Sequence, residues 1–140
     1  MKNFIDLSLD EHKKILKWRN SEYVSKWMIN KHISLDEHLN FVKSLKNSNK
    51  LYFLVDDIGV IYFILKDDYA EIGLYKNPDK NRVGKILMKK IIDYGFNHLK
   101  LDKLILYVFE DNKKAISLYE KFGFQQIDKR ENIIKMELKK

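Results

Sequence analysis

The stretch Asn77–Met88, which reads N-P-D-K-N-R-V-G-K-I-L-M, joins a strand-like run at 70–75 to a helical run at 85–97. The helical run carries apolar residues at the spacing of one buried face. The first backbone N–H groups of such a helix have no partner within it, and they lie at the positive end of the helix dipole. A phosphate group can accept hydrogen bonds from them directly. The order of strand, short loop and helix therefore predicts an anion-binding site.

The residues of this loop fit the prediction. Lys80, Arg82 and Lys85 add positive charge, and Gly84 allows a ligand to approach the backbone closely. The loop lacks the full G-x-x-x-x-G-K-[ST] pattern of a P-loop. Taken alone, the loop is equally compatible with a plain connection between strand and helix. Only the flanking sequence can distinguish this interpretation from an anion-binding site.

Length and composition indicate one domain that spans residues 1–140. The chain is 45% hydrophobic and 13% aromatic, which suffices for a core of its own. It has no cysteine, which excludes disulfides and thiolate metal sites. Its four histidines show no metal-ligand spacing, so we expect no metal.

Charge and hydropathy limit the partners of the chain. The longest apolar runs, near 61–65 and 104–109, are too short to cross a membrane, and Asp6 and Asp10 interrupt the N-terminal segment, which is not a signal peptide. We therefore expect a cytoplasmic protein without a membrane partner. The net charge of +7 favours anionic ligands, such as a phosphorylated cofactor or nucleic acid. No stripe of alternating aromatic and cationic residues supports nucleic acid, so we expect a small-molecule ligand and a monomer or homodimer.

The apolar pattern predicts an α+β fold with one mixed, mostly antiparallel sheet flanked by helices. Ser8 and Ser34 each stand three residues before a glutamate, which predicts capping boxes at two helix starts. Turn residues at 56–59 and 66–68 predict an antiparallel meander, and the last two strands are expected to form a closing hairpin. The predicted strands are 2–7, 51–55, 60–65, 70–75, 104–109, 124–129 and 133–138, and the predicted helices are 8–19, 23–30, 34–45, 85–97 and 112–123.

Two motifs resemble the GNAT family of N-acetyltransferases, and the likeness covers nearly the whole chain. The pattern N-x-x-A-x-x-L-Y-x-K-x-G-F is complete at 112–124. The family's Q/R-x-x-G-x-G/A loop corresponds to D-K-N-R-V-G at 79–84, which keeps Gly84 but has Arg82 at the first glycine and Asp79 at the leading position. The resemblance implies the GNAT fold and acetyl-CoA as co-substrate.

The N-terminal half is similar to the branch that includes ribosomal-protein and sugar-nucleotide acetyltransferases. W-R-N at 18–20, W-M at 27–28 and I-S-L-D-E-H-L at 33–39 carry this likeness. It implies acetylation of the 4-amino group of a UDP-linked amino sugar in pseudaminic acid biosynthesis, a pathway of flagellin or surface-glycan modification. Two alternatives stay open, namely acetylation of a protein N-terminal α-amino group and a non-catalytic CoA-binding module.

Direct acetyl transfer to an amine makes three chemical demands. The amine must lose a proton, the thioester carbonyl must be polarised, and the departing thiolate must be protonated. The resemblance implies that Tyr119 is the acid that protonates the thiolate. Glu71, on the strand that enters the loop, is the candidate base, with a water chain as the alternative base and a purely structural role as the alternative for Glu71.

The resemblance also implies where the ligands lie. The pantetheine arm is expected along the strand before the loop, with an N–H near Leu74 as donor to the developing oxyanion, and the pyrophosphate is expected on the loop amides. The predicted cofactor-binding residues are Gly73, Leu74, Tyr75, Lys80, Asn81, Arg82, Val83, Gly84, Lys85, Asn112, Ala115 and Tyr119. The predicted residues of the acceptor side are Trp18, Arg19, Asn20, His38 and Glu71, of which Trp18, Arg19 and His38 are able to stack on a base or bind a diphosphate.

Overall fold

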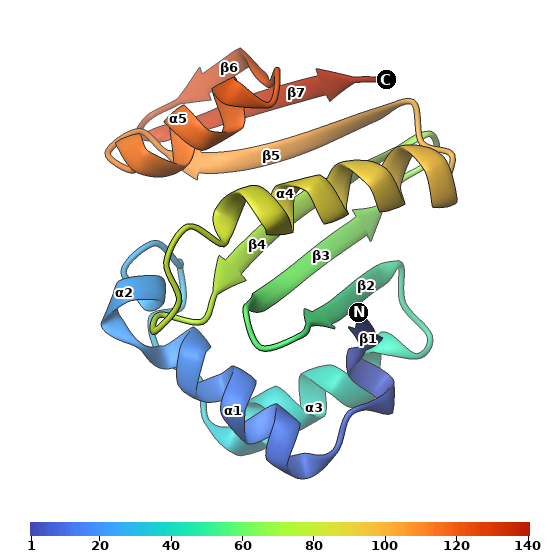
Figure 1. Cartoon of the computed structure of the whole chain (residues 1–140), viewed down its shortest axis with the longest axis vertical. Helices are drawn as coiled ribbons and strands as arrows, with labels where there is room; N and C mark the ends of the chain where they lie inside the picture. Colours follow the sequence, from blue (N-terminus) through green and yellow to red (C-terminus); the bar gives the residue numbers. More distant parts are fainter.

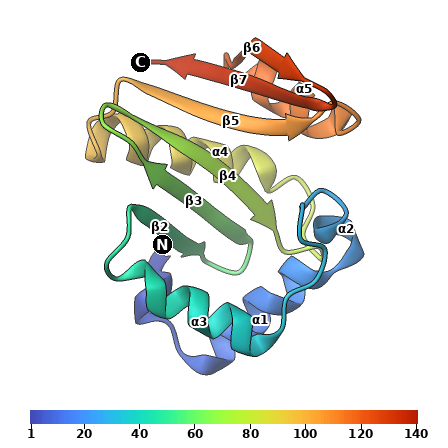
Figure 2. The ribbon, with the colours of Figure 1, turned by 180° about the vertical axis from the view of Figure 1, so that it is seen from behind.

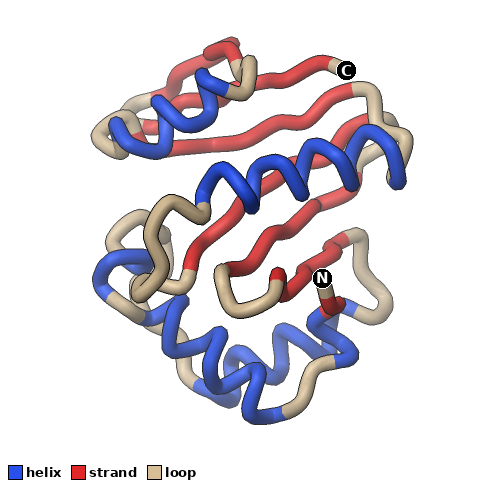
Figure 3. The backbone as a smooth tube through the Cα atoms, viewed as in Figure 1, coloured by secondary structure: helices blue, strands red, loops and turns tan.

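The computed structural model describes residues 1–140, and its seven strands form one sheet in the order β1-β2-β3-β4-β5-β7-β6 (Figures 1 and 3). All neighbouring strands are antiparallel except β4 and β5, which are parallel. The strands are β1 Lys2–Asn3, β2 Lys50–Val55, β3 Gly59–Leu65, β4 Tyr69–Lys76, β5 Lys103–Phe109, β6 Gln125–Arg130 and β7 Ile133–Lys139. The helices are α1 Leu9–Asn20, α2 Glu22–Ser25, α3 Leu35–Leu45, α4 Gly84–Asp93 and α5 Lys113–Lys121. The predicted fold class is confirmed.

Helices cover both faces of the sheet. Figure 1 shows α4 and α5 in front of the sheet, and Figure 2, from behind, shows α3 on the opposite face. The larger core lies beneath α4, where Phe63, Leu87 and Leu104 are fully buried. A second core lies beneath α1 and α3 and contains Trp18 and Tyr75. Alternate residues of β4 therefore face different cores, as the pleat of a strand requires.

Local sequence explains most helix boundaries. Ser8 and Ser34 make the two predicted capping boxes, in which each serine side chain accepts from the N–H three residues on, at 3.2 and 3.1 Å. The helix predicted at 85–97 is observed as α4 followed by a π-helical turn, Tyr94–His98. No helix of the structure is long and apolar enough to cross a bilayer.

Two predicted elements are shorter than expected. The strand predicted at 2–7 is limited to β1, because Phe4–Asp6 forms a 3-10 turn that Asn3 caps by accepting from the N–H of Ile5 at 3.1 Å. The helix predicted at 23–30 ends at Ser25, because the following N–H groups of Trp27 and Met28 bond three residues back rather than four.

The helices α1 and α3 are joined by a buried pair of histidines. His12 and His38 are 4% and 3% exposed, and Nδ1 of His12 lies 3.0 Å from Nε2 of His38. The ring of Phe4 packs against both. Burial, and secondly the charge of His12, lowers the pKa of His38 to about 4, and burial also lowers the pKa of His12.

This pair predicts a loss of stability in mild acid. The pKa of His38 is lower in the folded chain than in the unfolded chain, so the unfolded chain binds more protons between the two values. The contribution of His38 to the free energy of unfolding is fully present above about pH 6.5 and is lost as pH falls toward 4. Between pH 7 and pH 5 this loss amounts to about 2 kcal/mol. Denaturant unfolding at both pH values measures this. We expect a shallower pH dependence in His38→Gln than in wild type, and identical slopes would contradict the account.

Candidate active site

The pairing between β4 and β5 ends early. Their ladder consists of three pairs and stops at Glu71 opposite Ile105. Beyond that point the two strands diverge toward the end of the sheet near α2 (Figure 1). The sheet is therefore open in its interior, between two strands that are each still paired on their other side.

The register shows that unpaired backbone groups line this opening. The N–H of Asn77 donates to the carbonyl of Ile58 at 2.8 Å, and the N–H of Lys66 donates to the carbonyl of Tyr69 at 2.9 Å. In an antiparallel ladder the bonded residues alternate, so the odd-numbered residues of β4 are bonded to β3. Leu74 is an even-numbered residue of β4, so its N–H and C=O point toward β5. At this position the β4–β5 ladder has already ended.

The same argument applies to β5. The N–H of Glu110 donates to the carbonyl of Asn132 at 2.8 Å, and the N–H of Lys140 donates to the carbonyl of Asp102 at 3.0 Å. Even-numbered residues of β5 are therefore bonded to β7, and Tyr107 directs its backbone groups toward β4. Two strands with free donors and acceptors face each other, which suits an extended ligand that hydrogen-bonds like an additional strand.

A cavity of about 1080 Å³ occupies the opening. Met88 of α4 and Tyr119 of α5 line it from the side of the larger core, while Tyr75 and Arg19 line it from the side of α1. The cavity is thus lined from both faces of the sheet, which suits two ligands that meet between the strands. Most of its lining residues are hydrophobic, which is usual for small-molecule sites.

The loop before α4 presents an uncapped helix N-terminus to this cavity. Val83 is the N-cap residue of α4 and makes no side-chain cap bond, so the first N–H groups of the helix are free for an anion. Arg82 adopts φ 61°, the left-handed conformation that favours glycine, at the position where the family pattern has its first glycine. A Cβ on Gly84 would lie 3.0 Å from the Leu118 side chain, so this glycine lets α4 and α5 pack closely. Arg82, Val83, Gly84 and Lys85 all line the cavity.

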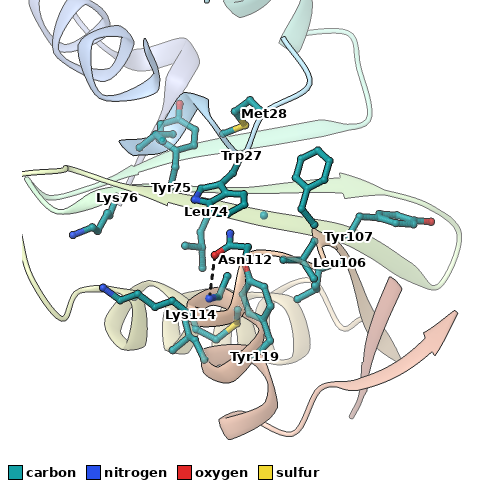
Figure 4. Close-up of a pocket in the computed structure, with 18 of the residues that line it drawn as sticks. Trp27, Met28, Leu74, Tyr75, Lys76, Leu106, Tyr107, Asn112, Lys114 and Tyr119 are labelled. Atoms are coloured by element: carbon teal, nitrogen blue, oxygen red, sulfur yellow. Dashed lines mark hydrogen bonds between the residues drawn. The ribbon is translucent and has the colours of Figure 1, made fainter. Parts of the chain in front are cut away.

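The α5 motif supplies two polar side chains at the cavity (Figure 4). The Asn112 side-chain oxygen accepts from the N–H of Ala115 at 3.3 Å, which caps the helix and leaves the amide NH₂ of Asn112 free to donate. Burial, and secondly the proximity of Tyr62, raises the pKa of Tyr119 to about 12. Tyr119 is therefore protonated at neutral pH, as a proton donor must be.

The predicted cofactor residues lie at the cavity with two exceptions. Gly73, Leu74 and Tyr75 of β4 line it, and so do Asn112, Ala115 and Tyr119. Lys80 and Asn81 do not. Lys80 instead pairs with Asp57 at 3.6 Å, and its carbonyl accepts from Lys76 at 2.6 Å.

Of the residues predicted for the acceptor side, the structure brings only Arg19 to the cavity wall. Its Nη2 donates to the carbonyl of Asn30 at 2.7 Å, and its Nη1 is buried without a partner. Glu71 is half-buried beside the opening, and its charge contributes to raising the pKa of Tyr62.

The other three predicted acceptor residues have structural contacts elsewhere. Trp18 is 5% exposed in the second core, and His38 bonds to His12. The side chain of Asn20 both donates to the carbonyl of Ile33 at 2.7 Å and accepts from its N–H at 3.0 Å. The geometry therefore does not support direct substrate contact by these three.

Sequence reasoning missed a cluster of lysines around Tyr23 at the cavity. Nζ of Lys114 lies 3.4 Å from the Tyr23 hydroxyl, and Lys76 and Lys26 lie 4.7 and 5.9 Å from its ring centroid. None of these lysines forms a salt bridge. Lys114 and Lys76 hold the pKa of Tyr23 below its usual value, mainly through the hydrogen bond from Lys114. The three lysines are far apart in a lysine-rich sequence, so no local pattern identifies them.

Comparison with known proteins shows the family to which the chain belongs. The sequence pattern of the acetyltransferase (GNAT) family matches residues 12–124, and the chain belongs to this family. The predicted acetyl-CoA-dependent N-acetyltransferase is thereby confirmed at the level of the family.

Individual relatives make the likeness more specific. The chain is 46% identical to "Acetyltransferase PseH" of Campylobacter jejuni over 134 residues, which cover 91% of this chain and 85% of the relative. The crystal structure of Campylobacter jejuni N-acetyltransferase PseH in complex with acetyl coenzyme A matches with a TM-score of 0.83 at 38% identity, over 99% of this chain and 96% of that chain. Spermidine N-acetyltransferase of Vibrio cholerae, in complex with CoA and spermine, shares the fold at 23% identity with a TM-score of 0.82, over 95% and 92% of the two chains.

The geometry predicts that Tyr119→Phe lowers kcat by about 100-fold or more, the range of general acid catalysis. The KM for acetyl-CoA is expected to stay nearly unchanged, because the lost interaction matters mainly in the transition state. Steady-state kinetics measures both constants. Tyr69→Phe, which removes a hydroxyl outside the cavity, is the matched control. Wild-type turnover in Tyr119→Phe would show that another group protonates the thiolate.

Proposed function

We propose that this chain transfers the acetyl group of acetyl-CoA directly to the 4-amino group of a UDP-linked amino sugar in pseudaminic acid biosynthesis. The observation that carries the proposal is the cavity that joins the two faces of the sheet, together with the match to Acetyltransferase PseH along most of both chains. A donor and an acceptor can then meet at the point where β4 and β5 separate. A cytoplasmic location and a monomeric or dimeric state stay predictions.

The proposed cofactor site uses polar groups of β4, α4 and α5 that have no hydrogen-bond partner within the protein. The uncapped N–H groups of α4 bind the pyrophosphate of acetyl-CoA, and the pantetheine arm runs between Leu74 and Asn112. The N–H of Leu74, which has no protein partner, donates to the thioester carbonyl oxygen as negative charge develops there.

The chemical step needs no covalent enzyme intermediate. The amine nitrogen attacks the thioester carbonyl carbon, and the carbon–sulfur bond breaks to give the amide and the thiolate. Tyr119 gives its proton to the thiolate sulfur. Glu71, directly or through water, takes the proton that the amine loses, and the tyrosine regains its proton from solvent.

The acceptor side is cationic and partly aromatic. Arg19 has one buried, unpartnered nitrogen, and Lys26, which also lines the cavity, has no acidic partner. A diphosphate fits such a surface, because charge-assisted bonds to phosphate are the strong ones. Trp27 adds a flat apolar wall (Figure 4). The same charges disfavour a polyamine such as spermidine, since like charges at a site act against a cationic ligand.

A panel of acceptors tests the proposal. We expect thiol release from acetyl-CoA with a UDP-linked 4-amino sugar at a kcat/KM at least about 100-fold above that for N-terminal peptides or spermidine. Arg19→Ala is expected to raise the KM for the sugar nucleotide by about 10-fold or more and to leave the KM for acetyl-CoA unchanged.

Lys14→Ala is the control for this variant, because Lys14 is also on α1 but pairs with Asp57 and does not line the cavity. Efficient peptide acetylation together with inactivity on the sugar nucleotide would contradict the acceptor class and leave the acetyltransferase assignment intact. An unchanged sugar KM in Arg19→Ala would contradict only the role of Arg19.

A further inference from the structure

Tyr62 of β3 occupies space that only a glycine on β4 leaves free. Tyr62 stands opposite Gly73 in the β3–β4 ladder. A Cβ built on Gly73 would lie 2.1 Å from both Cζ and the hydroxyl oxygen of Tyr62. The phenol end of Tyr62 therefore lies over the backbone of Gly73, one residue before the free N–H of Leu74. Any side chain at position 73 would displace it.

The ring of Tyr62 is held from behind by other aromatic rings. Tyr52 of β2 stacks on it with centroids 4.7 Å apart and an interplanar angle of 12°. Phe41 and Phe4 in turn pack against Tyr52 at 4.9 and 5.4 Å. Tyr62 lines the cavity, whereas Tyr52 does not. The stack thus fixes the direction of the Tyr62 hydroxyl, the only one of this stacked pair that belongs to a cavity-lining residue.

The hydroxyl of Tyr62 has no partner within the protein. No hydrogen bond of the structure involves it, and the half-buried side chain of Tyr62 lines the cavity. If Tyr62 only filled the aromatic stack, a phenylalanine would serve as well. A free hydroxyl aimed at the cavity is instead available to a ligand.

The surroundings of Tyr62 are those of the reacting atoms. Glu71 lies on the same face of β4 as Gly73, two residues earlier, and Tyr119 borders the cavity from α5. Burial, and secondly the charge of Glu71, raises the pKa of Tyr62 to about 12. Tyr62 is therefore a neutral hydroxyl at physiological pH, which can accept a hydrogen bond from an amine.

We propose that Tyr62 is a substrate-contacting residue whose hydroxyl oxygen accepts a hydrogen bond from the acceptor amine and orients its nitrogen toward the thioester above Gly73. Gly73 is required because it lets the phenol reach this place. Tyr62 keeps its proton throughout, so the proton balance of the acetyl transfer is unchanged. The inference rests on the proposed transfer to an amine, but not on which amine it is.

The test compares Tyr62→Phe with Tyr52→Phe. Each variant removes one hydroxyl from the same pair of stacked rings and keeps the rings, but only Tyr62 lines the cavity. With acetyl-CoA and a UDP-linked 4-amino sugar both varied, Tyr62→Phe is expected to lower the kcat/KM for the acceptor by about 10-fold. Its KM for acetyl-CoA should stay within about 2-fold of wild type, and Tyr52→Phe should match wild type in both constants.

A second variant separates the position of the hydroxyl from its presence. Gly73→Ala keeps the Tyr62 hydroxyl but displaces it, so we expect an acceptor kcat/KM at least as low as that of Tyr62→Phe. Thermal unfolding of each variant serves as the control for correct folding.

Three results would overturn the proposal, namely an unchanged acceptor kcat/KM in Tyr62→Phe, an equal loss in Tyr52→Phe, or a loss confined to the KM for acetyl-CoA. If wild type prefers a peptide or spermidine, the proposed acceptor class fails. The same comparison with that amine then decides the role of Tyr62 separately.

Discussion

The early end of the β4–β5 ladder is the constraint on which the rest of the site depends. Strands inside a sheet normally satisfy each other's backbone groups, and here they stop doing so after Glu71 and Ile105. The sheet stays intact because β3 and β7 hold the outer sides of the two strands. The result is a fixed slot with free N–H and C=O groups, and the fold provides it before any ligand arrives.

The slot also explains why the site has two chemically different sides. Because strand residues alternate between faces, Leu74 belongs with α4 and α5, whereas Gly73 and Tyr75 face α1. The uncapped start of α4, where we propose that phosphate binds, lies on the first side. Arg19 and Tyr62 line the second side, and Tyr52 stacks on Tyr62 from behind, outside the cavity. Acetyl transfer between two ligands fits a site that is lined from both faces of the sheet.

Local sequence patterns predict the helix starts and the loop between β4 and α4. The capping boxes at Ser8 and Ser34 and the loop before Gly84 follow from residues close in sequence. The sequence does not show burial, so it assigns Trp18 and His38 to the acceptor side, although Trp18 packs in the second core and His38 pairs with the buried His12. No local pattern identifies Tyr62, because the role that we propose for it depends on the register of β3 with β4. The turn at 66–68, which joins β3 to β4, fixes that register, so the signal is present in the sequence.

Amide hydrogen exchange at Leu74 tests the central claim most directly. If its N–H points into the slot without a protein partner, it should exchange rapidly in the free protein, unlike the neighbouring amides of Gly73 and Tyr75, which are bonded to β3. Acetyl-CoA should then slow exchange at Leu74 by about 10-fold or more. The account is contradicted if Leu74 is already protected in the free protein, or if acetyl-CoA protects the amides of Val83–Lys85 and leaves Leu74 unchanged.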